Sequence, residues 1–224
     1  FACFTDLIRN LPAGAQIFAL FVHYPQLADL VGSVLVKAPA LTRQLGQKPG
    51  LFDLLLNTEF FTPLATDPLS LRSITEYARE AGGPEQALNQ LCLWASEERV
   101  RGDVHLLQGL CNVREASARL SEIADICIHE ITKMARQDMR RRYGQLPEEQ
   151  FAVIGLGRLG CQQLTSVSDL DLMFVYDSPS NTLSDGQQAL EAGRYYNRLS
   201  QLIISWLSVQ TTKGKLFDVD TRLR

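Results

Sequence analysis

A glycine-rich turn followed by a strand with two aspartates constrains the fold of this chain more than any other feature. The sequence G-L-G-R-L-G occupies residues 155–160, directly after the apolar run F-A-V-I. The segment S-D-L-D-L-M-F-V-Y follows at 168–176. Side chains alternate across a strand, so Asp169 and Asp171 share one face while Leu170 and Leu172 point into the core. The pattern predicts a half-buried strand with a carboxylate pair beside a tight turn.

The turn also matches the G-x-G-x-x-G fingerprint of a dinucleotide site, with Asp177 about 20 residues further on. Such a unit needs a crossover helix of at least about ten residues. Only residues 161–168 lie between the last glycine and the next strand. A buried parallel strand would also carry Val or Ile where Asp169 and Asp171 stand. A Rossmann-type dinucleotide-binding protein is therefore the disfavoured alternative.

The carboxylate pair is typical of a metal site. Asp169 and Asp171 lie about 7 Å apart along an ideal strand and repel each other unless a cation lies between them. Hard oxygen ligands select Mg²⁺ or Mn²⁺. Two such ions can clamp the phosphates of a nucleoside triphosphate. The turn at Gly160 and Cys161 offers backbone N–H groups to those phosphates.

A third carboxylate is expected on the last predicted strand, in the sequence K-L-F-D-V-D-T-R-L at 215–223. Asp218 and Asp220 are both candidates. They have the same facing on a strand, so spacing alone leaves the choice between them open. Arg222, on the same strand, is a candidate for contact with the phosphates.

The chain changes pattern near residue 147. Before it, apolar residues recur at helical spacing, and two long helices are predicted at about 84–108 and 114–143, with a loop at 57–68. After it, the predicted elements are strands at 151–155 and 170–176, a loop at 177–186, a helix of about 20 residues and the last strand. This order predicts an α+β fold with a helical subdomain at 1–146 and a mixed domain at 147–224.

Composition limits the partners and the compartment. The net charge is −3, and the one basic cluster, residues 140–142, ends a predicted helix, where cations complement the helix dipole. We therefore expect no nucleic acid substrate. No apolar run has the length of a membrane span. The five cysteines are widely spaced without a C-x-x-C pair, which favours a reducing, cytoplasmic setting.

Three motifs together resemble a known family. They are G-L-G-R-L-G at 155–160, S-D-L-D-L-M-F at 168–174 and F-D-V-D-T-R-L-R at 217–224. In order and spacing they are similar to the three motifs of bacterial glutamine-synthetase adenylyltransferase, and the likeness covers nearly the whole chain. Details at 182–186 and 195–199 resemble the family's C-terminal, adenylylating half. The alternative is its other half, which removes AMP by phosphorolysis.

The resemblance implies a polymerase-β-like nucleotidyltransferase fold and a Mg²⁺-dependent transferase that moves AMP from ATP to a tyrosine of glutamine synthetase. Two Mg²⁺ ions are expected, with Mn²⁺ as a substitute. A PII-type signalling protein is the implied regulator of the full-length, multifunctional enzyme of nitrogen metabolism. Carried over by position, the metal-binding and catalytic carboxylates are Asp169, Asp171 and Asp220, with Asp218 at a non-ligand position. Phosphate contacts fall on Gly157, Gly160, Cys161, Ser168 and Arg222.

Three positions depart from the family pattern. Arg158 stands for a lysine, Cys161 for a glycine and Gln163 for a glutamate. Arginine keeps the charge but changes its geometry, and cysteine removes the backbone freedom of glycine. We also expect the chain to be a piece of a longer protein, with a catalytic core truncated on its C-terminal side. The fragment alone is then expected to bind metal weakly or to be inactive.

Overall fold

The computed structural model describes residues 21–22, 25–38, 41–42, 45, 54–55, 58–61, 82–179 and 181–221. They belong to two units, one formed by 1–66 with 97–116 and the other by 67–96 with 117–224. Helices α7 (Pro84–Leu107) and α8 (Val113–Tyr143) each contribute residues to both units. The predicted division near residue 147 concerns sequence pattern, and it stays a prediction.

The described residues of the first unit lie mainly in helices. It contains α3 (Pro25–Lys37), the short 3-10 helix η1 (Thr58–Phe61) and the end of α7. η1 lies inside the segment predicted as a loop. Arg101 Nε and His105 Nε2 lie 3.2 Å and 2.6 Å from the carbonyl oxygen of Phe60, which accepts both hydrogen bonds. The buried apolar residues of this unit are Leu30, Val31, Val34, Leu41, Leu45, Leu55, Phe60, Val100 and Val104.

Both predicted long helices are confirmed to within one residue at each end. α8 begins where Asn112 accepts a hydrogen bond from the Glu115 N–H and the Glu115 carboxylate accepts one from the Asn112 N–H. This reciprocal pair satisfies two N–H groups that the helix itself leaves unbonded. The predicted apolar stripe of α8 is confirmed in the core of the second unit by Leu120, Ile123, Ala124, Cys127 and Ile131.

The second unit contains a three-stranded sheet in the order β1-β2-β3. The strands are β1 (Gln150–Gly155), β2 (Leu170–Asp177) and β3 (Val219–Asp220). β1 pairs antiparallel with β2, and β2 pairs parallel with β3. The helix α9 (Gly157–Gly160) joins β1 to the loop before β2. Helices with this small sheet make the second unit α+β, as predicted.

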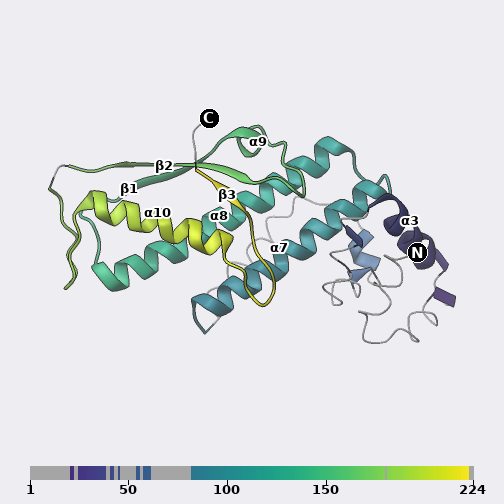
Figure 1. Ribbon diagram of the computed structural model, residues 1–224, viewed down its shortest axis with the longest axis horizontal. Helices are drawn as coiled ribbons and strands as arrows, with labels where there is room; N and C mark the ends of the chain where they lie inside the picture. Colours follow the sequence, from purple (N-terminus) through teal and green to yellow (C-terminus); the bar gives the residue numbers. More distant parts are fainter. Residues whose placement is uncertain are drawn as a thin grey trace. The chain divides into compact units, whose positions relative to one another are not determined.

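Helix α10 (Ala192–Ser208) runs alongside the sheet (Figure 1). Its Tyr196 ring stacks on Phe151 of β1 and on Tyr176 of β2, with centroids 5.7 Å and 4.5 Å apart. Tyr195, Leu199 and Ile203 are fully buried, as the helical spacing predicts. The helix therefore covers the face of the sheet that carries Phe151 and Tyr176.

The predicted last strand is wrong over residues 215–218, which form no strand. The Lys215 ammonium instead folds back onto both carboxylate oxygens of Asp218. The Phe217 N–H donates to the carbonyl of Leu207 at the end of α10, at 2.9 Å. Because these groups bond locally, pairing with β2 begins only at Val219. Residues 222–223 of the prediction lie outside the described part.

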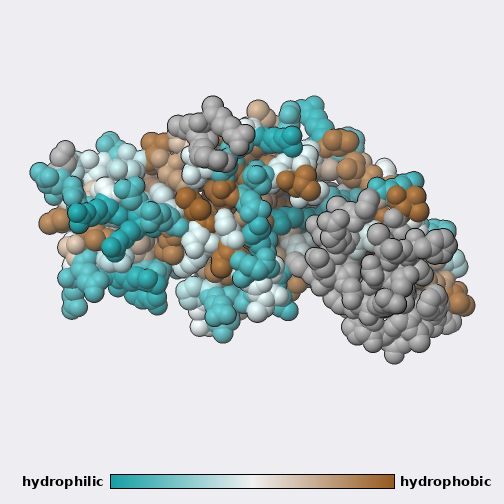
Figure 2. Space-filling view, viewed as in Figure 1, coloured by the Kyte–Doolittle hydropathy of each residue, from teal (hydrophilic) through white to brown (hydrophobic). Residues whose placement is uncertain are grey.

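The surface of the described residues carries both hydrophobic and hydrophilic side chains. Hydrophobic side chains show in several small patches among hydrophilic ones (Figure 2). In the described part of the chain, no helix has the length and hydropathy to cross a membrane. Cys92 and Cys127 are buried as small hydrophobes, whereas Cys161 is exposed.

Candidate functional site

The glycine turn is fixed by close contact with Asp171. Gly157 has φ +53°, a backbone conformation that L side chains rarely adopt. A Cβ at this position would collide with the carboxylate of Asp171. The Leu156 N–H also donates to the Asp171 carbonyl at 2.8 Å. Glycine is therefore needed here for two reasons, and the turn holds the carboxylate against its own backbone.

Asp171 lies opposite Asp220. In the parallel pairing of β2 with β3 these two residues are direct partners, and Leu170 is the partner of Val219. Registered partners on neighbouring strands lie about 4.8 Å apart and place their side chains on the same face. Both residues are partly buried, whereas Leu170 and Leu172 are buried in the core. The predicted alternation of β2 is confirmed at these positions.

The other two aspartates are more exposed. Asp169 precedes the first residue of β2 and is exposed. Asp218 has a side chain that is 62% exposed and forms an ion pair with Lys215. Its carbonyl accepts a hydrogen bond from the Leu170 N–H at 2.9 Å. Register and this ion pair favour Asp220 over Asp218 as the partner of Asp171, while the metal-binding role itself stays a prediction.

The side chains do not form a closed metal site. Among the residues that the structure describes, no three His, Cys, Asp or Glu side chains are gathered closely enough to hold a metal ion. The carboxylate oxygens of Asp171 and Asp220 are nevertheless the hard ligands that Mg²⁺ prefers, and their register brings them to the same point of one face. The donor set fits a divalent ion in type and in backbone placement. Side-chain rotation would have to complete it.

The backbone N–H groups of the turn are partly used within it. The Gly160 N–H donates to the Leu156 carbonyl at 3.0 Å, and the Cys161 N–H donates to the Gly157 carbonyl at 3.2 Å. These two groups are therefore not the free donors that the sequence suggested. A Cβ at Gly160 would lie 2.8 Å from the Gly155 carbonyl oxygen. Gly160 therefore allows the turn to pass close to the carbonyl of Gly155 at the end of β1.

Ser168 ties the turn before β2 to the glycine turn. Its hydroxyl oxygen accepts a hydrogen bond from the Thr165 N–H at 3.0 Å and lies 2.8 Å from the Thr165 hydroxyl. The Arg158 guanidinium donates to the same oxygen at 3.3 Å. The remaining predicted phosphate contact, Arg222, lies outside the described residues.

The topology excludes the dinucleotide interpretation of the glycine turn. A dinucleotide fingerprint joins two parallel strands through a crossover helix. Here β1 and β2 are antiparallel, and α9 has only four residues. Asp177 pairs with Gln150 at the opposite end of β2 from Asp171. The carboxylate that completed the fingerprint in the sequence is therefore remote from the turn.

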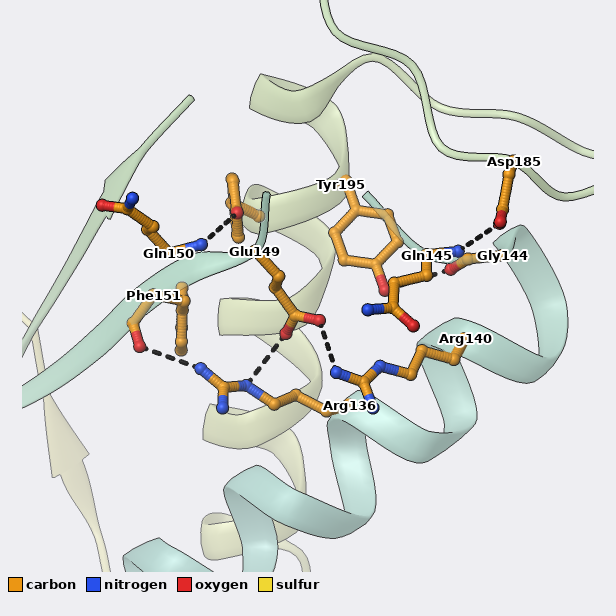
Figure 3. Close-up of polar contacts among 10 residues, drawn as sticks. Arg136, Arg140, Gly144, Gln145, Glu149, Gln150, Phe151, Asp185 and Tyr195 are labelled. Carbon is orange, nitrogen blue, oxygen red and sulfur yellow. Dashed lines mark hydrogen bonds and ion pairs between the residues drawn. The ribbon is translucent and has the colours of Figure 1, made fainter. Parts of the chain in front are cut away.

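A buried charge network that the sequence analysis missed lies where α8 meets β1 (Figure 3). The Glu149 carboxylate, 6% exposed, forms ion pairs with Arg136 at 3.0 Å and with Arg140 at 2.8 Å. Arg136 also donates to the Phe151 carbonyl at 2.8 Å. Burial and, to a lesser extent, the nearby negative charge of Glu149 raise the pKa of Tyr195 to about 12.

The basic cluster at 140–142 does more than complement the dipole at the end of α8. Arg141 and Arg142 form ion pairs with Asp138 within α8. Arg140 reaches beyond the helix to Glu149. The signal in the sequence was a pair of glutamates a few residues after a run of three arginines.

Known proteins resemble this chain over its length. The family described as Glutamate-ammonia ligase adenylyltransferase matches residues 28–224. A bifunctional glutamine synthetase adenylyltransferase/adenylyl-removing enzyme of Rhizobium meliloti is 33% identical, over 100% of this chain and 23% of that protein. Proteins of the same name from Brucella melitensis and Brucella suis are each 32% identical, over 99% of this chain and 23% of theirs.

The chain thus spans less than a quarter of the length of these relatives. The family match, by contrast, extends over most of its residues and includes the glycine turn, β2 and β3. The chain therefore belongs to the Glutamate-ammonia ligase adenylyltransferase family.

Proposed function

We propose that this chain is part of the half of its parent enzyme that transfers AMP from ATP to a tyrosine of glutamine synthetase. The observation that carries the proposal is the register of Asp171 with Asp220 beside the positive-φ turn at Gly157. In that arrangement two carboxylates lie side by side on the paired strands β2 and β3, next to the backbone of the glycine turn. It is the arrangement that a polymerase-β-like nucleotidyltransferase core needs.

In the proposed reaction the tyrosine oxygen attacks the α-phosphorus of ATP in line with the departing pyrophosphate. A new oxygen–phosphorus bond forms, the bond between the α-phosphorus and the bridging oxygen breaks, and the tyrosine proton passes to Asp220. Gly157 and Gly160 keep the turn tight so that the phosphates can approach its backbone. Ser168 and Cys161 border the same turn.

Asp169, Asp171 and Asp220 are the residues proposed to hold Mg²⁺. The bound ions would supply electrostatic stabilisation of the attacking oxygen and of the leaving pyrophosphate. Asp171 contributes most to this role because its carbonyl accepts a hydrogen bond from the Leu156 N–H and its carboxylate lies close to Gly157. Asp169, which is exposed, completes the set from the loop before β2.

The wider setting is also a proposal. The curated relatives are named for both addition and removal of the adenylyl group. We assign this chain to the adding half because its motifs resemble that half. Glutamine synthetase is the proposed protein substrate, a PII-type protein the proposed regulator of the full-length enzyme, and the cytoplasm the proposed compartment.

The test is the variant Asp171→Asn in the full-length enzyme, assayed for AMP transfer to glutamine synthetase with ATP and Mg²⁺. Loss of an electrostatic group of this kind typically costs about 10²–10³ in rate. The matched control is Asp177→Asn, an exposed carboxylate at the other end of the same strand. We expect the control to keep the wild-type rate within about twofold, as surface substitutions do.

The same two variants also identify the half. Adenylylated glutamine synthetase and phosphate are supplied in a separate reaction, and release of ADP is measured. Asp171→Asn should keep this removal activity. If Asp171→Asn retains more than about a tenth of the transfer rate, the proposed role is wrong. If it loses only removal, the chain belongs to the other half.

A further inference from the structure

Arg158 lies in the glycine turn of the proposed site, and its side chain is exposed. Among the residues that the structure describes, its guanidinium donates one hydrogen bond, to the neutral hydroxyl of Ser168, and forms no ion pair. A guanidinium carries five donors. Four of them are thus left for a ligand or for water.

The place of Arg158 relative to the carboxylates is defined by its neighbours. It directly follows Gly157, whose backbone touches the Asp171 carboxylate. Its bonding partner, Ser168, directly precedes Asp169. The hydrogen bond from Arg158 to Ser168 therefore joins the two segments that carry the carboxylates. A group held by Asp169 and Asp171 would therefore lie beside the two segments that this hydrogen bond joins.

Ser168 is itself held in place. Its hydroxyl oxygen accepts from the Thr165 N–H, and the Ser168 N–H donates to the Thr165 carbonyl at 3.0 Å. A side chain fixed by a two-way local bond can direct a flexible arginine at a low cost in conformational entropy. The structure thus contains a cation, a fixed acceptor that orients it, and free donors.

We propose that Arg158 binds the β- and γ-phosphates of the nucleotide, with Ser168 as the residue that positions its guanidinium. The inference rests on the proposed function, and it adds a residue to the site. Planar guanidinium donors match phosphate oxygens in pairs. The charge that accumulates on the leaving pyrophosphate lies on these same phosphates, so Arg158 should stabilise the transition state more than bound ATP.

The experiment measures binding of a phosphate ligand at the glycine turn, and it does not depend on catalysis. Cys161 is exposed and lies three residues after Arg158. Full-length enzyme is treated with a thiol-alkylating reagent over a range of inorganic tripolyphosphate concentrations. Modification of Cys161 is then followed by mass spectrometry of its peptide. We expect tripolyphosphate to slow alkylation of Cys161 in the wild-type enzyme.

Four variants separate charge, geometry and position. Arg158→Gln should require about tenfold more tripolyphosphate for the same protection, equivalent to about 1.4 kcal/mol. Arg158→Lys keeps the charge and should stay within about threefold of wild type. Arg194→Gln removes an equally exposed arginine from α10, and it should behave as wild type. Ser168→Ala should weaken protection in the wild-type background and add nothing to Arg158→Gln.

Equal protection in wild type and Arg158→Gln would overturn the proposal, as would a wild-type Cys161 that tripolyphosphate does not protect. Additive effects of the two substitutions would overturn the positioning role of Ser168. Failure of the proposed function has a different result, because it appears as AMP transfer that survives Asp171→Asn.

Discussion

At the scale of single residues, the site depends on the absence of a side chain at Gly157 as much as on the carboxylate of Asp171. Gly157 adopts φ +53° and leaves the space that the Asp171 carboxylate fills. The sequence identified this glycine and the aspartate pair from their pattern alone. Spacing alone could not choose Asp220 over Asp218, because both have the same facing, and the family resemblance made that choice. The register of β3 and the ion pair between Asp218 and Lys215 favour the same residue.

Gly157→Ala should reduce AMP transfer in the full-length enzyme by about 100-fold, because displacement of a catalytic group by about 1 Å has an effect of this size. The added methyl group must displace the Asp171 carboxylate, and the backbone conformation is also strained. The control is Gly193→Ala in α10, where an added Cβ meets its nearest atom, the Tyr176 hydroxyl oxygen, at 3.9 Å. Equal transfer rates in the two variants would contradict the account of this turn.

At the scale of elements, the sheet is anchored to α8 through charge. Glu149 stands just before β1 and pairs with two arginines one turn apart on α8. Figure 3 shows both guanidinium groups directed at the one carboxylate. The two long helices and both longer strands could be predicted because their apolar periodicity is strong. The Glu149 contact could not, because local pattern contains no information on how β1 lies against α8.

Glu149→Ala should loosen β1, since it leaves two arginines beside a buried space without their anion. A buried ion pair broken on one side costs several kcal/mol, and the partial exposure of both arginines lowers the expected effect to about 2 kcal/mol. Native-state hydrogen exchange of the β1 amides measures it, with an expected loss of protection of more than tenfold. Glu148→Ala is the control, because Glu148 is the exposed neighbour. Unchanged β1 protection in Glu149→Ala would show that the network does not hold the strand.

At the scale of the whole molecule, the order of elements distinguished a Rossmann dinucleotide site from the proposed nucleotidyltransferase site. The short segment between the glycine turn and β2 correctly excluded a Rossmann unit, because no crossover helix fits in it. The antiparallel pairing of β1 with β2 gives the structural reason. The end of the sheet was harder to predict. The segment K-L-F-D at 215–218 was predicted as the start of the last strand, but Lys215 and Asp218 bond to each other and the Phe217 N–H bonds to α10.

The central claim is that Asp171 and Asp220 form one catalytic pair on the neighbouring strands β2 and β3. The most direct measurement compares AMP transfer to glutamine synthetase by full-length Asp220→Asn and Asp218→Asn enzymes, which differ only in which of two nearby carboxylates is neutralised. We predict that Asp220→Asn loses about 10²–10³ in rate, whereas Asp218→Asn loses little because its carboxylate is occupied by Lys215. Full activity in Asp220→Asn, with the loss confined to Asp218→Asn, would contradict the claim.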